Sequence, residues 1–368
     1  MKRVVAAMVF LGKEKNEKRT VLILLTACAV CAVCSCVGAG PARATPAGAP
    51  RWVTDKDAAY PNSEWFCYVA IGEDKSLAEN AAIAGLARIF NVNIQETMYD
   101  SERFAQVIVS ADRGRKIEAS AATQEFAREL VSSTSVSGLI GVQTDTWAAS
   151  DGKVYVIARM NRRECSARYA AMIRENESLI GHLIEEAEKY PATFDAFETL
   201  SFAFNVARVT DNFHNLLTVL DPSAAGGRPR YGNADMVNTL ARNAARSIVI
   251  AVKVEGDVDG RIAGAFGAYF TRLGFSTNTG GANAYTLSAV FNIEDYDVAN
   301  PARRFVQYLL TYSLANTAGL KKEFDSDYGR ESGVTREQAR QRAIRAAEDS
   351  IDSTGFAEKF GAYLASLL

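Results

Sequence analysis

Residues 65–72 read Trp-Phe-Cys-Tyr-Val-Ala-Ile-Gly, and this stretch decides the first folding unit of the chain. Its aromatic and β-branched residues place apolar side chains on both faces, and a glycine ends it, which is typical of a strand at the centre of a sheet. Downstream, Ser76-Leu-Ala-Glu79 has the pattern of a capping box, and apolar residues follow at helical spacing as far as Ile94. We therefore expect a central strand with a helix packed behind it.

Two further apolar stretches, residues 140–147 and 153–160, flank the dipeptide Asp151-Gly152. Such a dipeptide supplies the positive φ that a tight β-hairpin needs. A weaker strand and a second helix are expected between residues 95 and 132. Together these patterns predict an α+β domain over residues 51–163.

The rest of the chain has helical patterns first and strand patterns later. Two long amphipathic helices, separated at Pro191, predict an αα-hairpin over residues 164–221. Residues 222–244 begin with Pro-Ser-Ala-Ala-Gly-Gly and have the composition of a linker. Residues 245–368 combine strands with helices, and the alternation within residues 305–314 indicates a sheet covered on one side. The predicted fold class is α+β, with two small sheet-and-helix domains separated by an αα-hairpin.

The N-terminal segment has the order of a lipoprotein signal peptide. Charged residues 13–19 precede an apolar run at 21–33, which is shorter than the roughly 20 apolar residues of a membrane-spanning helix. The following Val33-Cys34-Ser35-Cys36 resembles a lipobox, in which a small residue precedes the lipidated cysteine. We therefore predict that residues 1–35 are removed and that Cys36 is the acylated mature N-terminus.

Acyl chains at Cys36 would hold the protein on a membrane, because each buried CH₂ contributes about 0.8 kcal/mol. Residues 36–50 are rich in proline, alanine and glycine and are expected to be a flexible spacer. The alternative is ordinary secretory cleavage near Ala44, which would release a soluble periplasmic protein.

Charge and cysteine content narrow the classes of partner. The 41 basic and 43 acidic residues nearly cancel, so nucleic acid is not an expected partner. Besides Cys36, the mature body is expected to contain Cys67 and Cys165. An oxidising compartment would permit a disulfide between them, but Cys67 lies in a strand expected to be buried, which favours two separate buried thiols.

Candidate reactive groups are few. His182 and His214 lie on predicted helices without suitably spaced partners, which favours structural or solvent-facing roles. Asp257 and Asp259 could bind Ca²⁺ or serve as a carboxylate pair, but aspartate and glycine are also the ordinary residues of a turn. We predict no cofactor, no metal site and no catalytic residue.

The succession of Trp52-Val53, Pro61, the strand at 65–72, the Ala-rich helix and the hairpin that ends at Met160 resembles the Lpp-twenty type of bacterial surface lipoprotein. That family is similar to the N-terminal domain of flagellar assembly protein T. Residues 245–368 resemble, in topology, the periplasmic domains of curli-secretion and penicillin-binding-protein-activator lipoproteins. These resemblances imply an envelope protein without assigned catalysis.

We therefore expect a membrane-anchored lipoprotein, held by N-terminal acyl chains such as palmitate, on the outer membrane and facing the periplasm or the cell surface. Its role would be non-catalytic binding or scaffolding, with protein partners in the envelope or in an envelope appendage. Two alternatives remain open: a periplasmic small-ligand receptor, and an envelope hydrolase that uses Asp257 and Asp259. The sequence leaves the oligomeric state open.

Overall fold

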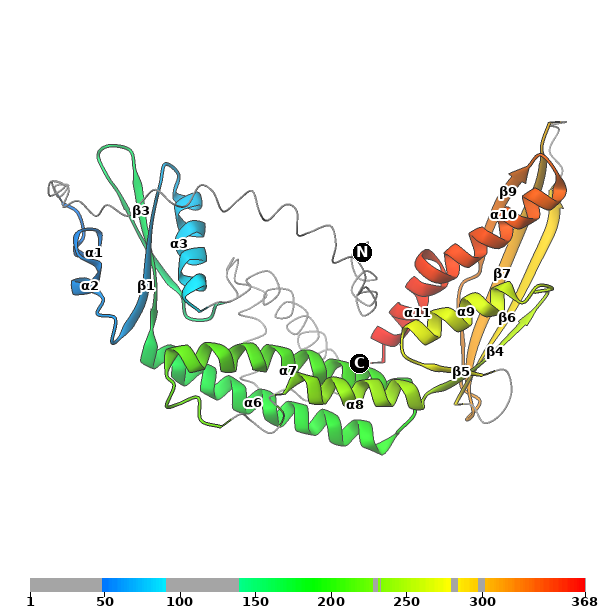
Figure 1. The fold of residues 1–368 in the computed structure, drawn as a ribbon, viewed down its shortest axis with the longest axis horizontal. Coiled ribbons are helices and arrows are strands. Elements are labelled where there is room, and N and C mark those ends of the chain that lie inside the picture. Colours follow the sequence, from blue (N-terminus) through cyan, green and yellow to red (C-terminus); the bar gives the residue numbers. More distant parts are fainter. Residues whose placement is uncertain are drawn as a thin grey trace, which may run out of the picture.

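The computed structural model has a sheet-and-helix unit at each end and a helical bundle between them (Figure 1). This α+β architecture confirms the predicted fold class. The structure describes residues 48–90, 139–227, 231, 233–278, 284–296 and 302–367. The strand and helix expected between residues 95 and 132 lie outside these ranges.

The first sheet has the strand order β1-β3-β2 and is antiparallel throughout, with β1 at Trp65–Gly72, β2 at Gln143–Ala148 and β3 at Val154–Asn161. The predicted hairpin is confirmed, and Gly152 in its turn has φ +82°. The predicted central position of residues 65–72 is wrong within the described sheet, where β3 is central and β1 lies at an edge.

Strand β1 is apolar on both faces because helices cover both. Helix α3 (Lys75–Ile89) packs on one face, against a core that includes Ala70 and Val156. Buried Trp52, in α1 (Arg51–Thr54), clusters with Cys67 and Ile157 on the other face, where α2 (Lys56–Ala59) also contributes. Apolar residues on both faces of a strand therefore indicate that both faces are covered, and they do not show that the strand has a neighbouring strand on each side.

The start of α3 differs from the predicted capping box. The Asp74 carboxylate caps the helix, accepting the backbone N–H groups of Ser76 at 2.8 Å and Leu77 at 3.1 Å. Ser76 therefore lies within the first turn. Glu79 instead accepts a hydrogen bond from the Thr144 hydroxyl at 2.8 Å, which joins the helix to β2.

The central bundle contains the predicted αα-hairpin, formed by α6 (Arg162–Lys189) and α7 (Phe194–Leu220), and a third helix, α8 (Ala234–Ser247). Helix α8 corrects the assignment of residues 222–244 to a linker. Its buried residues recur at helical spacing; Ala234, Val237 and Ala241 pack in the bundle core, and Ala245 packs in the core of the second sheet unit.

The second sheet has the order β5-β4-β6-β7-β8, and β9 also pairs with β7. Its strands are β4 (Val249–Glu255), β5 (Ser276–Asn278), β6 (Tyr285–Tyr296), β7 (Arg304–Asn316), β8 (Lys321–Glu323) and β9 (Asp327–Gly333). The pairs of β4 with β5 and with β6 are parallel, and the remaining pairs are antiparallel.

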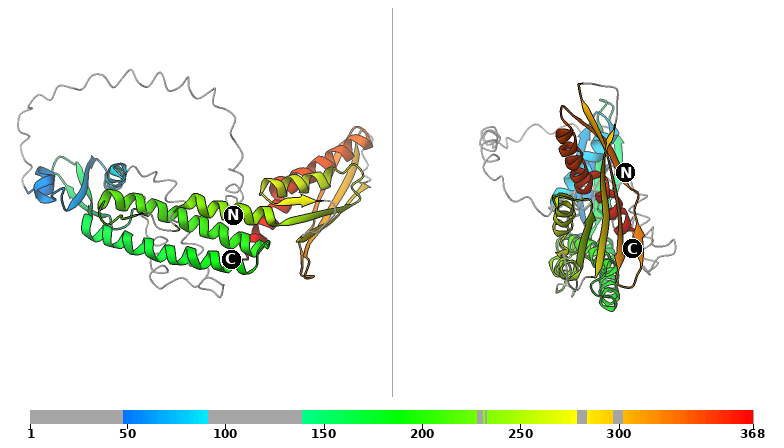
Figure 2. Two further views of the ribbon diagram at one scale, coloured as in Figure 1. Left: turned by 60° about the horizontal axis from the view of Figure 1, so that its bottom comes forward. Right: turned by 90° about the vertical axis from the view of Figure 1, so that its right-hand side faces the viewer.

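Helices cover one face of this sheet, as the alternation in residues 305–314 predicted (Figures 1 and 2). They are α9 (Arg261–Arg272) and α10 (Arg336–Asp349), followed by a π-helical turn, η2 (Ser350–Thr354), and α11 (Phe356–Ala365). Tightly packed aromatic side chains dominate the core between sheet and helices, among them Phe266, Phe270, Phe356 and Phe360.

Candidate functional site

The residue predicted to carry the lipid anchor, Cys36, lies outside the described residues. The described chain starts at Gly48 and enters α1, where buried Trp52 packs against the first sheet. Within the described ranges, no helix has both the length and the apolar character needed to cross a membrane. A lipid anchor at the N-terminus would be connected to the first sheet-and-helix unit, because the chain enters that unit through α1.

Asp257 and Asp259, the candidate carboxylate pair, lie in the turn between β4 and α9. The Asp257 carboxylate accepts the backbone N–H of Ala263 at 2.8 Å and thereby caps α9, while Gly260 has φ +68°. Val258 between them is 96 % exposed. The turn at Val258 therefore projects into solvent.

Neither histidine belongs to a group of potential metal ligands in the described part of the chain. His182 is exposed on α6 and His214 is half-buried on α7. Across the described ranges, no three residues among His, Cys, Asp and Glu cluster closely enough to bind a metal ion.

Cys67 and Cys165 are both buried and both free, as predicted. They belong to different cores, because Cys67 faces α1 whereas Cys165 lies in α6 beneath Gly141. Burial raises the pKa of each thiol to about 11. Both therefore remain protonated near neutral pH and are weak nucleophiles.

A half-buried polar cluster, which sequence patterns did not reveal, joins β7, β9, η2 and α11. Lys359 Nζ lies 2.5 Å from Asp327 Oδ1, and Asp327 Oδ2 accepts the hydroxyls of Ser350 at 2.8 Å and Tyr312 at 3.0 Å. Burial and the neighbouring Asp327 carboxylate raise the pKa of Tyr312. The mutual pairing of these groups locks α11 and the π-helical turn onto the sheet.

A small cavity of about 250 Å³ opens where the α6–α7 turn meets the end of α8. Its walls are mostly aliphatic, with Ile184, Leu200 and Leu240 among them, and Glu188 and Asn243 supply polar atoms. This volume is below the roughly 300–1,000 Å³ of typical ligand pockets. The cavity has room for one small apolar group, and a small-ligand receptor would need a larger site.

No protein-family model matches the chain, and no curated protein matches it either. Solved structures show distant likenesses. A minor lipoprotein from Acinetobacter baumannii is 11 % identical, with 32 % of this chain and 90 % of that chain covered and a TM-score of 0.24. A secreted protein from Helicobacter pylori is 9 % identical, with coverages of 81 % and 97 % and a TM-score of 0.41. Rare lipoprotein B from Shewanella oneidensis is 13 % identical, with coverages of 32 % and 94 % and a TM-score of 0.23. Scores at this level assign neither a family nor a function to this chain.

Proposed function

We propose that this chain is a lipid-anchored, non-catalytic scaffold of the bacterial envelope, tethered through Cys36 and holding two sheet units apart for binding to protein partners. The observation that carries the scaffold proposal is the direct connection of both sheet units to one helical bundle. Helix α6 has 28 residues, which corresponds to a length of about 42 Å. The bundle therefore sets a fixed separation between two potential binding surfaces.

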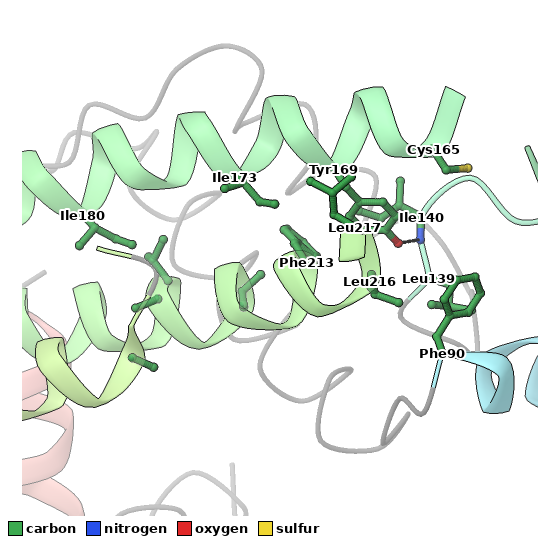
Figure 3. Packing of buried hydrophobic residues seen from close by; sticks show 14 of the residues in the cluster. Phe90, Leu139, Ile140, Cys165, Tyr169, Ile173, Ile180, Phe213, Leu216 and Leu217 are labelled. Atoms are coloured by element: carbon green, nitrogen blue, oxygen red, sulfur yellow. Dashed lines mark hydrogen bonds between the residues drawn. The ribbon is translucent and has the colours of Figure 1, made fainter. Parts of the chain in front are cut away.

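The connection to the first unit is tight. Strand β3 ends at Asn161 and α6 begins at the next residue, with the Asn161 side chain accepting the N–H of Glu164 at 3.0 Å. The Arg162 guanidinium lies 3.8 Å from the ring centroid of Phe66 in β1. The buried hydroxyl of Tyr169 accepts the N–H of Ile140 at 2.9 Å (Figure 3). These contacts join the first sheet directly to the bundle.

The connection to the second unit is aromatic. Phe194, the first residue of α7, is fully buried in the core of the second unit. Its ring centroid lies 4.0 Å from that of Tyr285 and 5.2 Å from that of Phe275, and its backbone N–H donates to the Tyr285 hydroxyl at 3.1 Å. Packed aromatic contacts of this kind resist rotation between the bundle and the sheet.

The anchor is tested by mass spectrometry of the N-terminal peptide from the native protein. We expect an acylated peptide that begins at Cys36, and we expect Cys36→Ala to abolish both acylation and partitioning into the detergent phase. Cys34→Ala is the matched control and should leave the modification in place. A free N-terminus near Thr45 in the wild-type protein would contradict the anchor and favour a soluble periplasmic receptor.

A further inference from the structure

The second sheet leaves one face uncovered by any helix that the structure describes (Figure 2). The residues that point away from α9 and α10 are defined by strand alternation, because Leu287, Ala289 and Phe291 are buried on the covered side. On β6 and β7, four successive outward pairs form what we call the hydroxyl strip: Thr286 with Ala315, Ser288 with Ser313, Val290 with Thr311, and Asn292 with Leu309. The next outward pair along the same two strands is Glu294 with Gln307.

The hydroxyl strip contains no charged residue, and the first charged residue along β6 beyond it is Glu294. Interaction surfaces are depleted of charged residues at their centres. Short side chains at the centre of the strip, such as Ser288 and Ser313, leave a shallow floor along the two strands. The six-residue separation from Thr286 to Asn292 corresponds to about 20 Å of strand.

Charges of both signs border the strip. Lys253 and Glu255 lie beside it on β4, and Lys321 and Glu323 lie beside it on β8. In one row across the sheet, Lys253, Ser288, Ser313 and Glu323 are successive neighbours. The borders therefore have no net charge, which disfavours a polyanion or an anionic lipid surface as the occupant.

One end of the strip is aromatic and apolar. Tyr328 of β9 pairs with Leu309, and the two side chains are 81 % and 41 % exposed. Further along the same face, the Arg330 guanidinium lies 4.3 Å from the ring centroid of Tyr296. An exposed tyrosine ring beside a hydroxyl-lined floor presents a stacking surface next to groups that both donate and accept hydrogen bonds.

We propose that the hydroxyl strip and Tyr328 bind an uncharged glycan chain. Sugar hydroxyls donate and accept hydrogen bonds, as serine and threonine hydroxyls do, and the C–H face of a pyranose ring packs on an aromatic ring. Protein interfaces concentrate Trp, Tyr and Arg at their centres, where this strip has serine and threonine. The length of the strip accommodates several sugar rings.

Isothermal titration of the purified full-length protein with cellohexaose and with chitohexaose tests the proposal. We expect saturable binding of at least one of the two oligosaccharides. Tyr328→Ala should weaken that binding about tenfold through loss of ring stacking. Thr311→Val keeps the side-chain shape and removes one hydroxyl, and it should weaken binding about fivefold. Circular dichroism of each variant checks that the fold is retained.

Tyr190→Ala is the matched control, because Tyr190 is also exposed, at 67 %, but lies at the α6–α7 turn. It should leave glycan binding unchanged. The proposal is overturned if neither oligosaccharide binds, if Tyr328→Ala and Tyr190→Ala behave alike, or if heparin binds more tightly than both neutral oligosaccharides.

Discussion

Replacement of Phe194 by alanine tests the rigid junction on which the scaffold proposal rests. The Phe194 side chain is 0 % exposed and packs against the rings of Tyr285, Phe275 and Phe360. Truncation of a buried phenylalanine to alanine lowers the free energy of unfolding by about 3–5 kcal/mol. Because Phe194 joins α7 to the second core, we expect Phe194→Ala both to destabilise the protein and to loosen the second unit relative to the bundle.

Two measurements separate these effects. Urea denaturation reports the change in unfolding free energy. Pulsed electron resonance between spin labels at Ser150→Cys and Val258→Cys, which lie in exposed turns of the two units, reports the distribution of distances between them. The buried native thiols of the folded body react slowly with the label, since their pKa values are raised to about 11.

Phe213→Ala is the matched control. Phe213 is 1 % exposed and its ring centroid lies 5.3 Å from that of Tyr169, inside the bundle rather than at the junction. It should lose a similar free energy of unfolding but keep a narrow distance distribution. The reasoning is refuted if Phe194→Ala costs less than about 1 kcal/mol, or if it leaves the distance distribution as narrow as in the control.

Two further predictions concern the packing of the units. A Cβ at Gly355 would clash with Ser350 Oγ and with the Asp327 carboxylate, so Gly355→Ala should lower the urea midpoint of unfolding. A Cβ at Gly361 would have no atom within 4 Å, so Gly361→Ala should leave the midpoint unchanged or raise it slightly. Equal midpoints for the two variants would contradict the close packing at Gly355. Because burial raises the pKa of Cys67 and Cys165 from 9.0 to about 11, their alkylation by iodoacetamide should accelerate about tenfold per pH unit up to that value. Rapid alkylation of the folded protein at neutral pH would contradict this prediction, because it would show that the thiols are accessible. The same rise in pKa means that the two buried thiols contribute fully to stability below pH 9.0 and that this contribution is lost as the pH rises towards 11.

Local patterns predicted much of the secondary structure. The Asp151-Gly152 turn, the alternation within β7 and the two long helices of the bundle appear where their patterns indicated. Each depends on residues that are near neighbours along the chain, because turn conformation, strand alternation and helical periodicity are properties of short segments. The lipobox at Cys36 is local in the same sense, and the anchor stays a prediction.

The errors arose where the outcome depended on distant partners. Apolar residues on both faces of β1 were interpreted as a central position, but the two layers come from α1 and α3, and the strand lies at an edge of the described sheet. Helix α8 was assigned to a linker because the Pro- and Gly-rich composition of residues 222–227 was extended over the segment that follows, although α8 itself separates polar from apolar residues clearly. Asp74 rather than Ser76 caps α3. Which of two neighbouring polar residues becomes the cap depends on the position at which the chain leaves β1 and starts the helix.

The sequence by itself determined most of the segments and their order, and it carries the pattern from which an export signal is predicted. Only the tertiary structure decided the surfaces. Lys359 and Asp327 meet although 32 positions separate them, and the hydroxyl strip exists because β6 and β7 pair in one register. The physical reason is that turns and periodicities are set by covalent neighbours, whereas a binding face is set by strand register and by which faces the helices leave uncovered.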